Sequence, residues 1–381
     1  MRRLKVMSVF GTRPEAIKMS PLVLELQKRP EIQSMVCVTG QHREMLDSVL
    51  DIFGVKPDYD LNIMRPGQTL EGITSRVLEG MGGILREAAP DLVLVHGDTT
   101  TTFSAALAAF YEKAAVGHVE AGLRTWDMYS PFPEEMNRCM VARLASLHFS
   151  PTAANAKNLR DEAVTGKIFV TGNTGIDALK YTVGDGSFAT PELKELDFKS
   201  HRVIAMTCHR RENYGQPMEN IFAAVREIAE EFPDVEVVYP VHLSPVVQEA
   251  AKRNLGGIGR IHLIDPLDAV EMHRLMSKSY MVMTDSGGLQ EEAPALGRPV
   301  LVLRRETERP EAVAAGTARL AGTETADIVR MAESLLTDEA DYSAMAHAVN
   351  PYGDGDASRR IADAILYSFG YRDTPPDSFG V

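Results

Sequence analysis

Three acidic residues in the first half of the chain have local settings that suit proton transfer. They are Asp98 in Val-His-Gly-Asp-Thr-Thr, Glu120 in Val-Glu-Ala-Gly-Leu-Arg-Thr and Glu134 in Pro-Phe-Pro-Glu-Glu-Met-Asn-Arg. The first two follow short apolar runs that are typical of buried strands in a parallel sheet. Ligands of open α/β sheets bind beyond the carboxyl ends of such strands. With Arg124 and Arg138 nearby, we predict acid/base chemistry on a polar substrate; the alternative is that these carboxylates are structural caps or salt-bridge partners.

The composition indicates a globular protein of two domains. The chain has 381 residues, more than one usual core, and its 44% hydrophobic and 24% charged residues exclude large-scale disorder. A formal net charge of −13 opposes nonspecific binding to nucleic acid or to an anionic membrane, so an anionic ligand needs a local basic pocket.

No feature of the sequence directs the chain to a membrane or to an oxidising compartment. No apolar run approaches the roughly 20 residues that span a bilayer, and no signal peptide is recognised. Cys37, Cys139 and Cys208 are odd in number and lack metal-ligand spacing. They fit buried thiols in a reducing cytoplasm, which is the predicted location.

Short β-branched runs alternate with amphipathic stretches along most of the chain. Strands are expected at residues 5–10, 35–39, 92–96, 116–120, 147–150, 168–171, 203–207, 235–241, 261–264, 280–284 and 299–303, and helices at 15–28, 102–112, 137–145, 220–231, 245–254 and 357–369. This order predicts parallel sheets with helices on both faces. We expect two Rossmann-like domains, residues 1–171 and 172–356, with a polar, turn-rich stretch at 184–202. Neither has a GxGxxG dinucleotide fingerprint.

The loop Gly11-Thr12-Arg13-Pro14-Glu15 joins the first strand to the first helix. Pro suits an early helical position, and free N–H groups at a helix start attract anions. Arg13 and Lys18 add positive charge. A phosphate site and an ordinary βα turn with a surface arginine are equally compatible with this loop alone.

The run Asp285-Ser286-Gly287-Gly288-Leu289-Gln290-Glu291-Glu292 is a stronger phosphate-site candidate, because it follows an apolar strand. Gly287 and Gly288 would let a ligand approach the backbone, and Ser286 is a candidate N-cap of a helix whose start can hold a diphosphate. Glu292, one turn further on, could accept hydrogen bonds from ribose hydroxyls. Gly-rich packing before a solvated acidic helix is the alternative.

Histidines supply further candidates. His209, in Cys-His-Arg-Arg-Glu-Asn, follows a strand and could serve a leaving phosphate as proton donor or hydrogen-bond partner, because histidine titrates near neutral pH; a structural role is the alternative. His242 has a similar position and a weaker case, whereas His96 and His118 lie inside strands and are expected to be hydrogen-bonded core residues. No HExxH or comparable cluster predicts a metal.

Taken together, these segments resemble the non-hydrolysing bacterial UDP-N-acetylglucosamine 2-epimerases almost end to end. The matching motifs are Gly-Thr-Arg-Pro-Glu-Ala-Ile-Lys (11–18), Thr-Gly-Gln-His (39–42), those around Asp98, Glu120 and Glu134, Thr-Gly-Asn-Thr (171–174), His-Arg-Arg-Glu-Asn (209–213), Asp-Ser-Gly-Gly-Leu-Gln-Glu-Glu-Ala-Pro (285–294), Thr-Glu-Arg-Pro-Glu (307–311) and Asn-Pro-Tyr-Gly-Asp-Gly (350–355). Cys208 and Leu289 depart mildly from the family pattern.

The resemblance implies a GT-B architecture, in which two Rossmann-like domains with parallel sheets face across a cleft and a last helix, about 357–381, packs back onto the first domain. It implies a cytoplasmic homodimer, without a cofactor, that interconverts UDP-GlcNAc and UDP-ManNAc for surface polysaccharide synthesis. The implied residues are Asp98, Glu120, Glu134 and His209 for catalysis, Arg13, Lys18, Ser286, Gly287, Gly288 and Glu292 for UDP, and Gln41, His42, Arg65, Gln68, Arg210 and His242 for a regulatory UDP-GlcNAc site.

The chemistry of this reaction explains why more than one acid/base group is needed. The C2 proton of the sugar has no adjacent carbonyl, and transient oxidation needs a nicotinamide whose fingerprint is missing. Elimination of UDP to 2-acetamidoglucal and re-addition remains, with proton transfer on both faces of C2. A GT-B glycosyltransferase, a hydrolysing epimerase and a non-catalytic nucleotide-sugar sensor are the alternatives.

Overall fold

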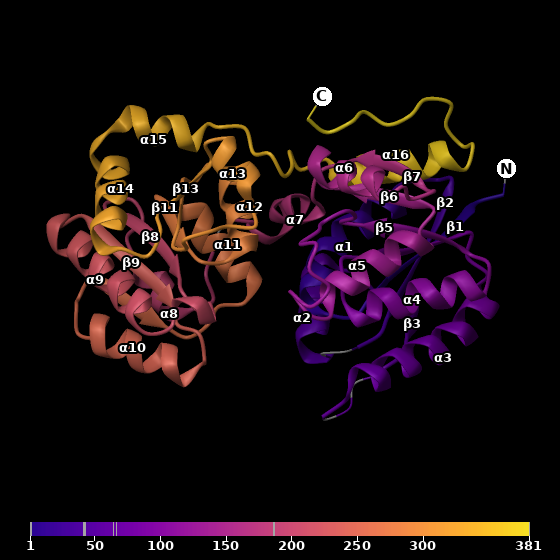
Figure 1. Cartoon of the computed structure of the whole chain (residues 1–381), viewed down its shortest axis with the longest axis horizontal. Helices are drawn as coiled ribbons and strands as arrows, with labels where there is room; N and C mark the ends of the chain where they lie inside the picture. Colours follow the sequence, from indigo (N-terminus) through magenta and orange to yellow (C-terminus); the bar gives the residue numbers. More distant parts are fainter. Residues whose placement is uncertain (1, 41–42, 64, 66, 186, 381) are drawn as a thin grey trace. The chain divides into compact units, whose positions relative to one another are not determined.

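The computed structural model describes residues 2–40, 43–63, 65, 67–185 and 187–380. The chain divides into two compact units, one of Met1–Tyr181 with Tyr352–Val381 and one of Thr182–Pro351. Each unit is built around a wholly parallel sheet, with its own apolar core (Figure 1). This confirms the predicted α/β class with two Rossmann-like domains.

The sheet of the first unit has seven strands in the order β3-β2-β1-β4-β5-β6-β7. The strands are β1 (Leu4–Phe10), β2 (Ile32–Val38), β3 (Tyr59–Asp60), β4 (Leu92–His96), β5 (Ala115–Val119), β6 (Leu147–Ser150) and β7 (Lys167–Val170). All residues of β4 are buried, as expected where helices cover both faces of a parallel sheet. The strand order reverses between β1 and β4, and such switch points are where α/β sheets bind ligands.

Helices connect these strands and close the unit. They are α1 (Arg13–Gln27), α2 (Arg43–Phe53), α3 (Leu70–Ala88), α4 (Thr100–Tyr111), α5 (Glu134–Leu144), α6 (Ala153–Asp161), α7 (Thr174–Thr182) and α16 (Ala357–Ser368). Several begin at a threonine whose hydroxyl accepts a backbone N–H, as Thr12 does for α1 and Thr99 for α4.

The second unit repeats this plan with six strands in the order β10-β9-β8-β11-β12-β13. The strands are β8 (Arg202–Thr207), β9 (Val235–Pro240), β10 (Ile261–Ile264), β11 (Met281–Thr284), β12 (Val300–Val302) and β13 (Ala318–Leu320). The helices are α8 (Pro191–Glu195), the 3₁₀ turn η1 (Arg211–Asn213), α9 (Gln216–Glu231), α10 (Pro245–Leu255), α11 (Ala269–Lys278), α12 (Gly287–Ala295), α13 (Pro310–Ala314), α14 (Thr325–Thr337) and α15 (Glu339–Ala346). Here the switch point lies between β8 and β11.

The sequence placed the domain limits at 171/172 and 356/357, several residues from those of the compact units. The difference is α7, which belongs to the first unit because the returning chain bonds to it. The Asn173 N–H donates to the Tyr352 carbonyl over 2.7 Å. The Asp177 carboxylate accepts the N–H groups of Ala357 and Ser358 at the start of α16, over 3.1 and 2.7 Å.

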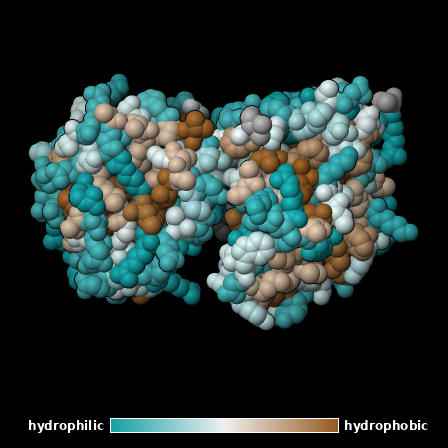
Figure 2. Space-filling model, turned by 45° about the horizontal axis from the view of Figure 1, so that its top comes forward, coloured by the Kyte–Doolittle hydropathy of each residue, from teal (hydrophilic) through white to brown (hydrophobic). Residues whose placement is uncertain are grey.

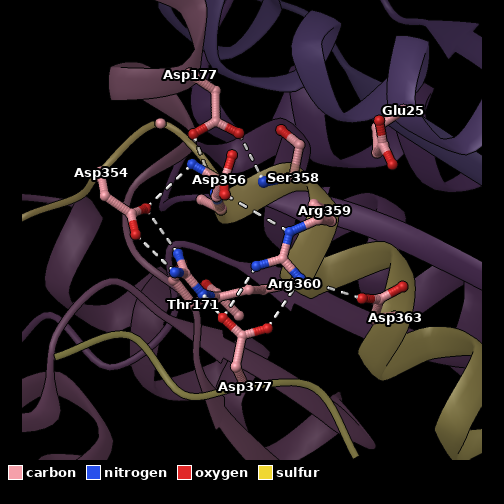
Figure 3. A network of polar contacts seen from close by, with 12 residues as sticks. Glu25, Thr171, Asp177, Asp354, Asp356, Ser358, Arg359, Arg360, Asp363 and Asp377 are labelled. Carbon is pink, nitrogen blue, oxygen red and sulfur yellow. Dashed lines mark hydrogen bonds and ion pairs between the residues drawn. The ribbon is translucent and has the colours of Figure 1, made fainter. Parts of the chain in front are cut away.

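Arg360 anchors the C-terminal segment to the first unit (Figure 3). Its guanidinium donates to both Asp354 oxygens, over 2.7 and 2.6 Å, to Asp377 over 2.9 Å and to the Thr171 carbonyl over 3.3 Å. The side chain is only 7% exposed. Figure 1 shows the result: α16, in yellow, lies among the indigo and magenta elements of the first unit although the whole second unit precedes it in sequence.

The surface is mainly hydrophilic, with apolar side chains scattered between the charged ones on the face that Figure 2 shows. Within the described part of the chain, we find no helix that is both long and apolar enough to cross a bilayer.

The anchoring role of Arg360 predicts a large stability effect. Arg360→Met removes a buried cation that satisfies two carboxylates and a carbonyl, so the free energy of unfolding should fall by about 3 kcal/mol in chemical denaturation. Arg330→Met is the control, because Arg330 and its partner Asp327 are 65% and 56% exposed, and it should change stability by less than about 0.5 kcal/mol. Equal stability of the two variants would contradict this assignment.

Candidate active site

A pocket of about 430 Å³ lies where the adjacent strands β1, β4 and β5 end. The loop after β1 and the first turns of α1 form one wall, and the segments after β4 and β5 form the others. The lining residues are Thr12, Arg13, Pro14, Glu15, Lys18, His96, Gly97, Asp98, Thr99 and Glu120. The pocket therefore brings together Asp98, Glu120, Arg13 and Lys18, all of which the sequence singled out.

Glu15 ties the loops after β1 and β4 together. One carboxylate oxygen accepts the N–H groups of Gly11 and Thr12, each over 2.8 Å, and the other accepts the hydroxyls of Thr99 and Thr102 over 2.6 and 3.1 Å. The expectation of free N–H groups in the Gly11–Glu15 loop is therefore wrong for Gly11 and Thr12, because Glu15 already occupies them.

Arg13 is the part of this loop that remains suited to an anion. Its half-buried side chain lines the pocket, and no acidic side chain in the described ranges forms an ion pair with it. Gly11 is required here by space, because a Cβ would come within 1.9 Å of the Thr39 hydroxyl oxygen. Anion binding at this loop would accordingly rely on the guanidinium rather than on the helix start.

Glu120 occupies a strained position directly after β5. Its φ of 62° lies in the left-handed region, which non-glycine residues rarely adopt and which is concentrated at functional sites. Lys18 of α1 forms an ion pair with its carboxylate, so the positive charge of Lys18 balances the negative charge of Glu120 within the pocket.

His96 has a different setting from the one expected. It is buried, as predicted, but it lines the pocket, and its Nε2 has no hydrogen-bond partner within the described residues. Glu120 Oε2 lies 3.7 Å from that nitrogen, too far for a hydrogen bond. Burial lowers the pKa of His96, so the ring is neutral. His118, by contrast, is hydrogen-bonded in the core as expected, with Nε2 2.7 Å from the Gly97 carbonyl.

Asp98 is held by Arg138 of α5. The guanidinium Nε and Nη2 lie 2.8 and 2.6 Å from Asp98 Oδ2. Burial raises the pKa of Asp98 above its ordinary value, while Arg138 opposes the rise and Glu120 adds to it. Asp98 therefore takes up a proton more readily than an exposed aspartate, as an acid/base group should.

Glu134, the third predicted carboxylate, is the first residue of α5. It does not line the pocket, but its half-buried side chain has one oxygen, Oε2, that is fully enclosed and without a hydrogen-bond partner among the residues described. Its neighbour Glu135 is the one that bonds Arg138, over 2.9 Å.

Asp285 organises the candidate phosphate site of the second unit. This fully buried carboxylate follows β11 and accepts the backbone N–H groups of His209 and Arg210, each over 2.7 Å. It also accepts the Asn213 amide over 3.2 Å, and the His209 Nδ1 lies 3.3 Å from its other oxygen. The segments after β8 and β11, adjacent strands, are thereby joined, and the His209 ring lies beside this carboxylate. Burial lowers the pKa of His209, and Asp285 opposes this shift.

The start of α12 leaves room for a ligand. Ser286 occupies the N-cap position, but its side chain makes no capping hydrogen bond. A Cβ added at Gly287 or Gly288 would come no closer than 3.9 Å to a neighbouring side chain, so packing does not require glycine at either position. The first N–H groups of a helix lack helical partners, and at this helix start Gly287 is buried whereas Gly288 is exposed. The Oε2 atom of Glu292 lies 3.4 Å from His273 Nε2.

The residues expected to form a regulatory site are only partly described. Gln41 and His42 lie outside the described residues. Arg65 is exposed, and the Gln68 side chain accepts a hydrogen bond from Arg76 over 2.6 Å. In the second unit Arg210 bonds the Asp285 carbonyl over 3.3 Å, and the His242 ring stacks on His209 with centroids 5.4 Å apart.

Sequence reasoning missed three carboxylates that organise these sites. Glu15 had a usable signal, because Thr12 and Glu15 have capping-box spacing. Asp285 directly follows a strand, which also indicates a site position. Nothing in the sequence distinguishes buried Glu135 from its neighbour Glu134. Over the described part of the chain, no three His, Cys, Asp or Glu side chains are grouped as a metal site would require.

Comparison with known proteins gives the family. A family model described as UDP-N-acetylglucosamine 2-epimerase matches residues 24–366. The UDP-N-acetylglucosamine 2-epimerase of Bacillus subtilis (strain 168) is 58% identical over 380 residues, which cover 100% of this chain and 99% of that protein. The chain belongs to the UDP-N-acetylglucosamine 2-epimerase family.

Solved structures of UDP-GlcNAc 2-epimerases agree with this assignment. The enzyme from Neisseria meningitidis bound to UDP-GlcNAc is 49% identical, with 95% of this chain and 100% of that chain covered and a TM-score of 0.84. The S. aureus MnaA–UDP co-structure is also 49% identical, covers 99% and 100% of the two chains and has a TM-score of 0.87. The resemblance to UDP-GlcNAc 2-epimerases and the GT-B class of fold are thus confirmed.

Two buried histidines on β5 and β6 predict acid sensitivity. His118 and His148 pair in register on β5 and β6, and burial lowers their pKa to about 3 and about 4. The fold holds both neutral, whereas the unfolded chain protonates them near pH 6.5, so their contribution to stability is lost as the pH falls below about 6.5. For His148 the loss between pH 7 and pH 5 should be about 2 kcal/mol.

The test compares pH slopes of the free energy of unfolding. His148→Leu should reduce the slope between pH 7 and pH 5, and the control His347→Leu, at an exposed histidine, should leave it unchanged. A His148→Leu slope equal to that of the wild type would show that His148 is not held neutral.

Proposed function

We propose that this chain epimerises C2 of UDP-GlcNAc reversibly to UDP-ManNAc without hydrolysis, and so supplies ManNAc for bacterial surface polysaccharides. The observation that carries the proposal is the pocket at the ends of β4 and β5, where Asp98 and Glu120 lie together in different electrostatic settings. The family membership and the UDP-GlcNAc named in the N. meningitidis structure support the substrate.

The reaction proceeds by elimination in this proposal. The C1–O bond to the UDP β-phosphate breaks, its electron pair leaves with UDP, and a carboxylate removes the C2 proton to give 2-acetamidoglucal. UDP then adds back to C1 while a second acid protonates C2 on the opposite face. Two proton-transfer groups are needed, and a buried, readily protonated Asp98 beside an ion-paired Glu120 supports that requirement.

Because the reaction is reversible, the group that acts as acid in one direction acts as base in the other. We therefore assign the acid/base work to Asp98, Glu120 and Glu134 as a set. Lys18 supplies the counter-charge of Glu120, and the strained backbone of Glu120 supports a position selected for function rather than for stability.

The second unit holds UDP in this proposal. The open start of α12 at Ser286, Gly287 and Gly288 suits the diphosphate, and Glu292 suits the ribose hydroxyls. His209, whose backbone N–H is held by buried Asp285 and whose ring lies beside it, stabilises the departing phosphate as a hydrogen-bond or proton donor. Arg13 adds a cation to the pocket of the first unit.

Product analysis tests the proposal directly. Purified protein with UDP-GlcNAc alone should form UDP-ManNAc, and Asp98→Asn should lower kcat by about 100-fold or more, because an amide cannot act as a general acid or base. Asp161→Asn, at an exposed residue, is the control and should keep full activity. Free ManNAc with UDP would indicate a hydrolase, and no product at all a glycosyltransferase or a sensor; either result would overturn the proposal.

We also propose that UDP-GlcNAc regulates the enzyme through Gln41, His42, Arg65, Gln68, Arg210 and His242. The contacts of Arg210 with Asp285 and of His242 with the His209 ring support coupling to catalysis. The initial rate should rise sigmoidally with UDP-GlcNAc, and His242→Ala should make the curve more nearly hyperbolic. A hyperbolic curve for the wild type would remove the regulatory site.

A further inference from the structure

The Glu135 side chain connects a surface loop to Arg138, which holds Asp98. It is 1% exposed, and one of its oxygens accepts the backbone N–H groups of Thr125 and Trp126, each over 3.0 Å. The other oxygen accepts the Arg138 Nη1 over 2.9 Å, and Arg138 in turn donates to Asp98. A continuous chain of hydrogen bonds therefore runs from the loop to the pocket.

The loop that Glu135 holds carries exposed aromatic side chains. Trp126 and Tyr129 are 64% and 81% exposed, and the Tyr129 ring stacks on Phe132 with centroids 6.2 Å apart. The loop is closed by its own bonds as well, since the Thr125 hydroxyl donates to the Ser130 carbonyl over 2.6 Å. Glu135 and Arg138 thus link the backbone of this loop to the Asp98 carboxylate.

The charges of this group decide what Arg138 does for Asp98. A fully ionised set of Glu135, Arg138 and Asp98 carries a net charge of −1 in a largely buried place, whereas protonation of Asp98 makes the set neutral. The negative charge of Glu135 thus offsets part of the electrostatic stabilisation that Arg138 would otherwise give to the ionised form of Asp98. An arginine without this second partner would hold Asp98 firmly as a carboxylate.

We propose that Glu135 is a positioning residue that shares Arg138 with Asp98, so that Asp98 can alternate between its proton-donating and proton-accepting forms during epimerisation. The inference rests on the proposed function, which makes Asp98 an acid/base group. Arg138 is the second positioning residue, because it acts through Asp98. Neither lines the pocket.

Other charged groups also face Asp98 and remain unchanged in the test. They are Glu120 after β5 and Lys18 and Arg13 on α1, together with the neutral but titratable His96 on β4. Glu120 raises the pKa of Asp98 and Lys18 lowers it, and these two are paired with each other. Replacing Glu135 or Arg138 therefore changes the electrostatic potential at Asp98 through a residue of α5, while the other charged groups around Asp98 stay the same.

The two removals shift the same titration in opposite directions. Glu135→Gln keeps an oxygen for the loop N–H groups but deletes a negative charge, so the pKa of Asp98 falls. Arg138→Met deletes the positive charge, so the pKa of Asp98 rises. Loss of a purely structural contact would not produce shifts of opposite sign.

The experiment measures kcat and KM for UDP-GlcNAc against pH, with UDP-ManNAc as the detected product. One limb of the kcat profile should move to lower pH in Glu135→Gln and to higher pH in Arg138→Met. At a pH where the displaced limb overlaps the wild-type optimum, kcat should fall roughly tenfold for each pH unit by which the limb has moved. The KM for UDP-GlcNAc should stay nearly unchanged. An unmoved limb in both variants, or displacements of the same sign, would overturn the inference.

Two controls separate this result from loss of folding and from a wrong function. Asp341→Asn breaks an arginine–carboxylate pair of the second unit, with Arg319, and should lower the unfolding temperature without moving either limb. If Arg138→Met does not fold, Arg138→Lys replaces it and should keep the limb near its wild-type position while kcat falls; a displaced limb would count against the inference. A wild-type chain that makes no UDP-ManNAc overturns the proposed function itself.

Discussion

Three buried carboxylates, each of which accepts several hydrogen bonds, hold the loops of the candidate sites in place. Glu15 joins the loops after β1 and β4, and Asp285 does the same after β8 and β11. Glu135 fixes the loop that precedes α5. A buried carboxylate is costly unless its oxygens are bonded, so each of these loops has one favoured arrangement. The pocket residues are thereby positioned before any ligand binds.

The same buried charges explain which features could be predicted from the sequence. Apolar runs gave β4, β6 and β10 with the bounds that the structure has, because a buried parallel strand is a continuous hydrophobic stretch. β3 and β13, of two and three residues, are too short to leave a pattern. The domain limits were displaced because bonds between α7 and the returning chain connect residues about 180 positions apart.

The site, like the fold, could be predicted where a local motif marks it and not where it depends on contacts between distant residues. Motif position correctly placed Asp98 and Glu120 at one pocket, but it could not show that Lys18 pairs with Glu120 or that His96 lines the cavity. Those facts depend on side chains from separate elements, which no local pattern encodes. The homodimer stays a prediction, as do the individual roles of Asp98, Glu120 and Glu134.

Proton exchange at C2 by separate acidic groups is the central claim, and isotope incorporation tests it most directly. UDP-GlcNAc is converted by the purified protein in deuterated water without added nicotinamide, and the product is examined by mass spectrometry and proton NMR. Because the proton is removed by one group and returned by another that exchanges with solvent, the UDP-ManNAc formed should carry one deuterium at C2. UDP-ManNAc that retains the original hydrogen at C2 would contradict the account.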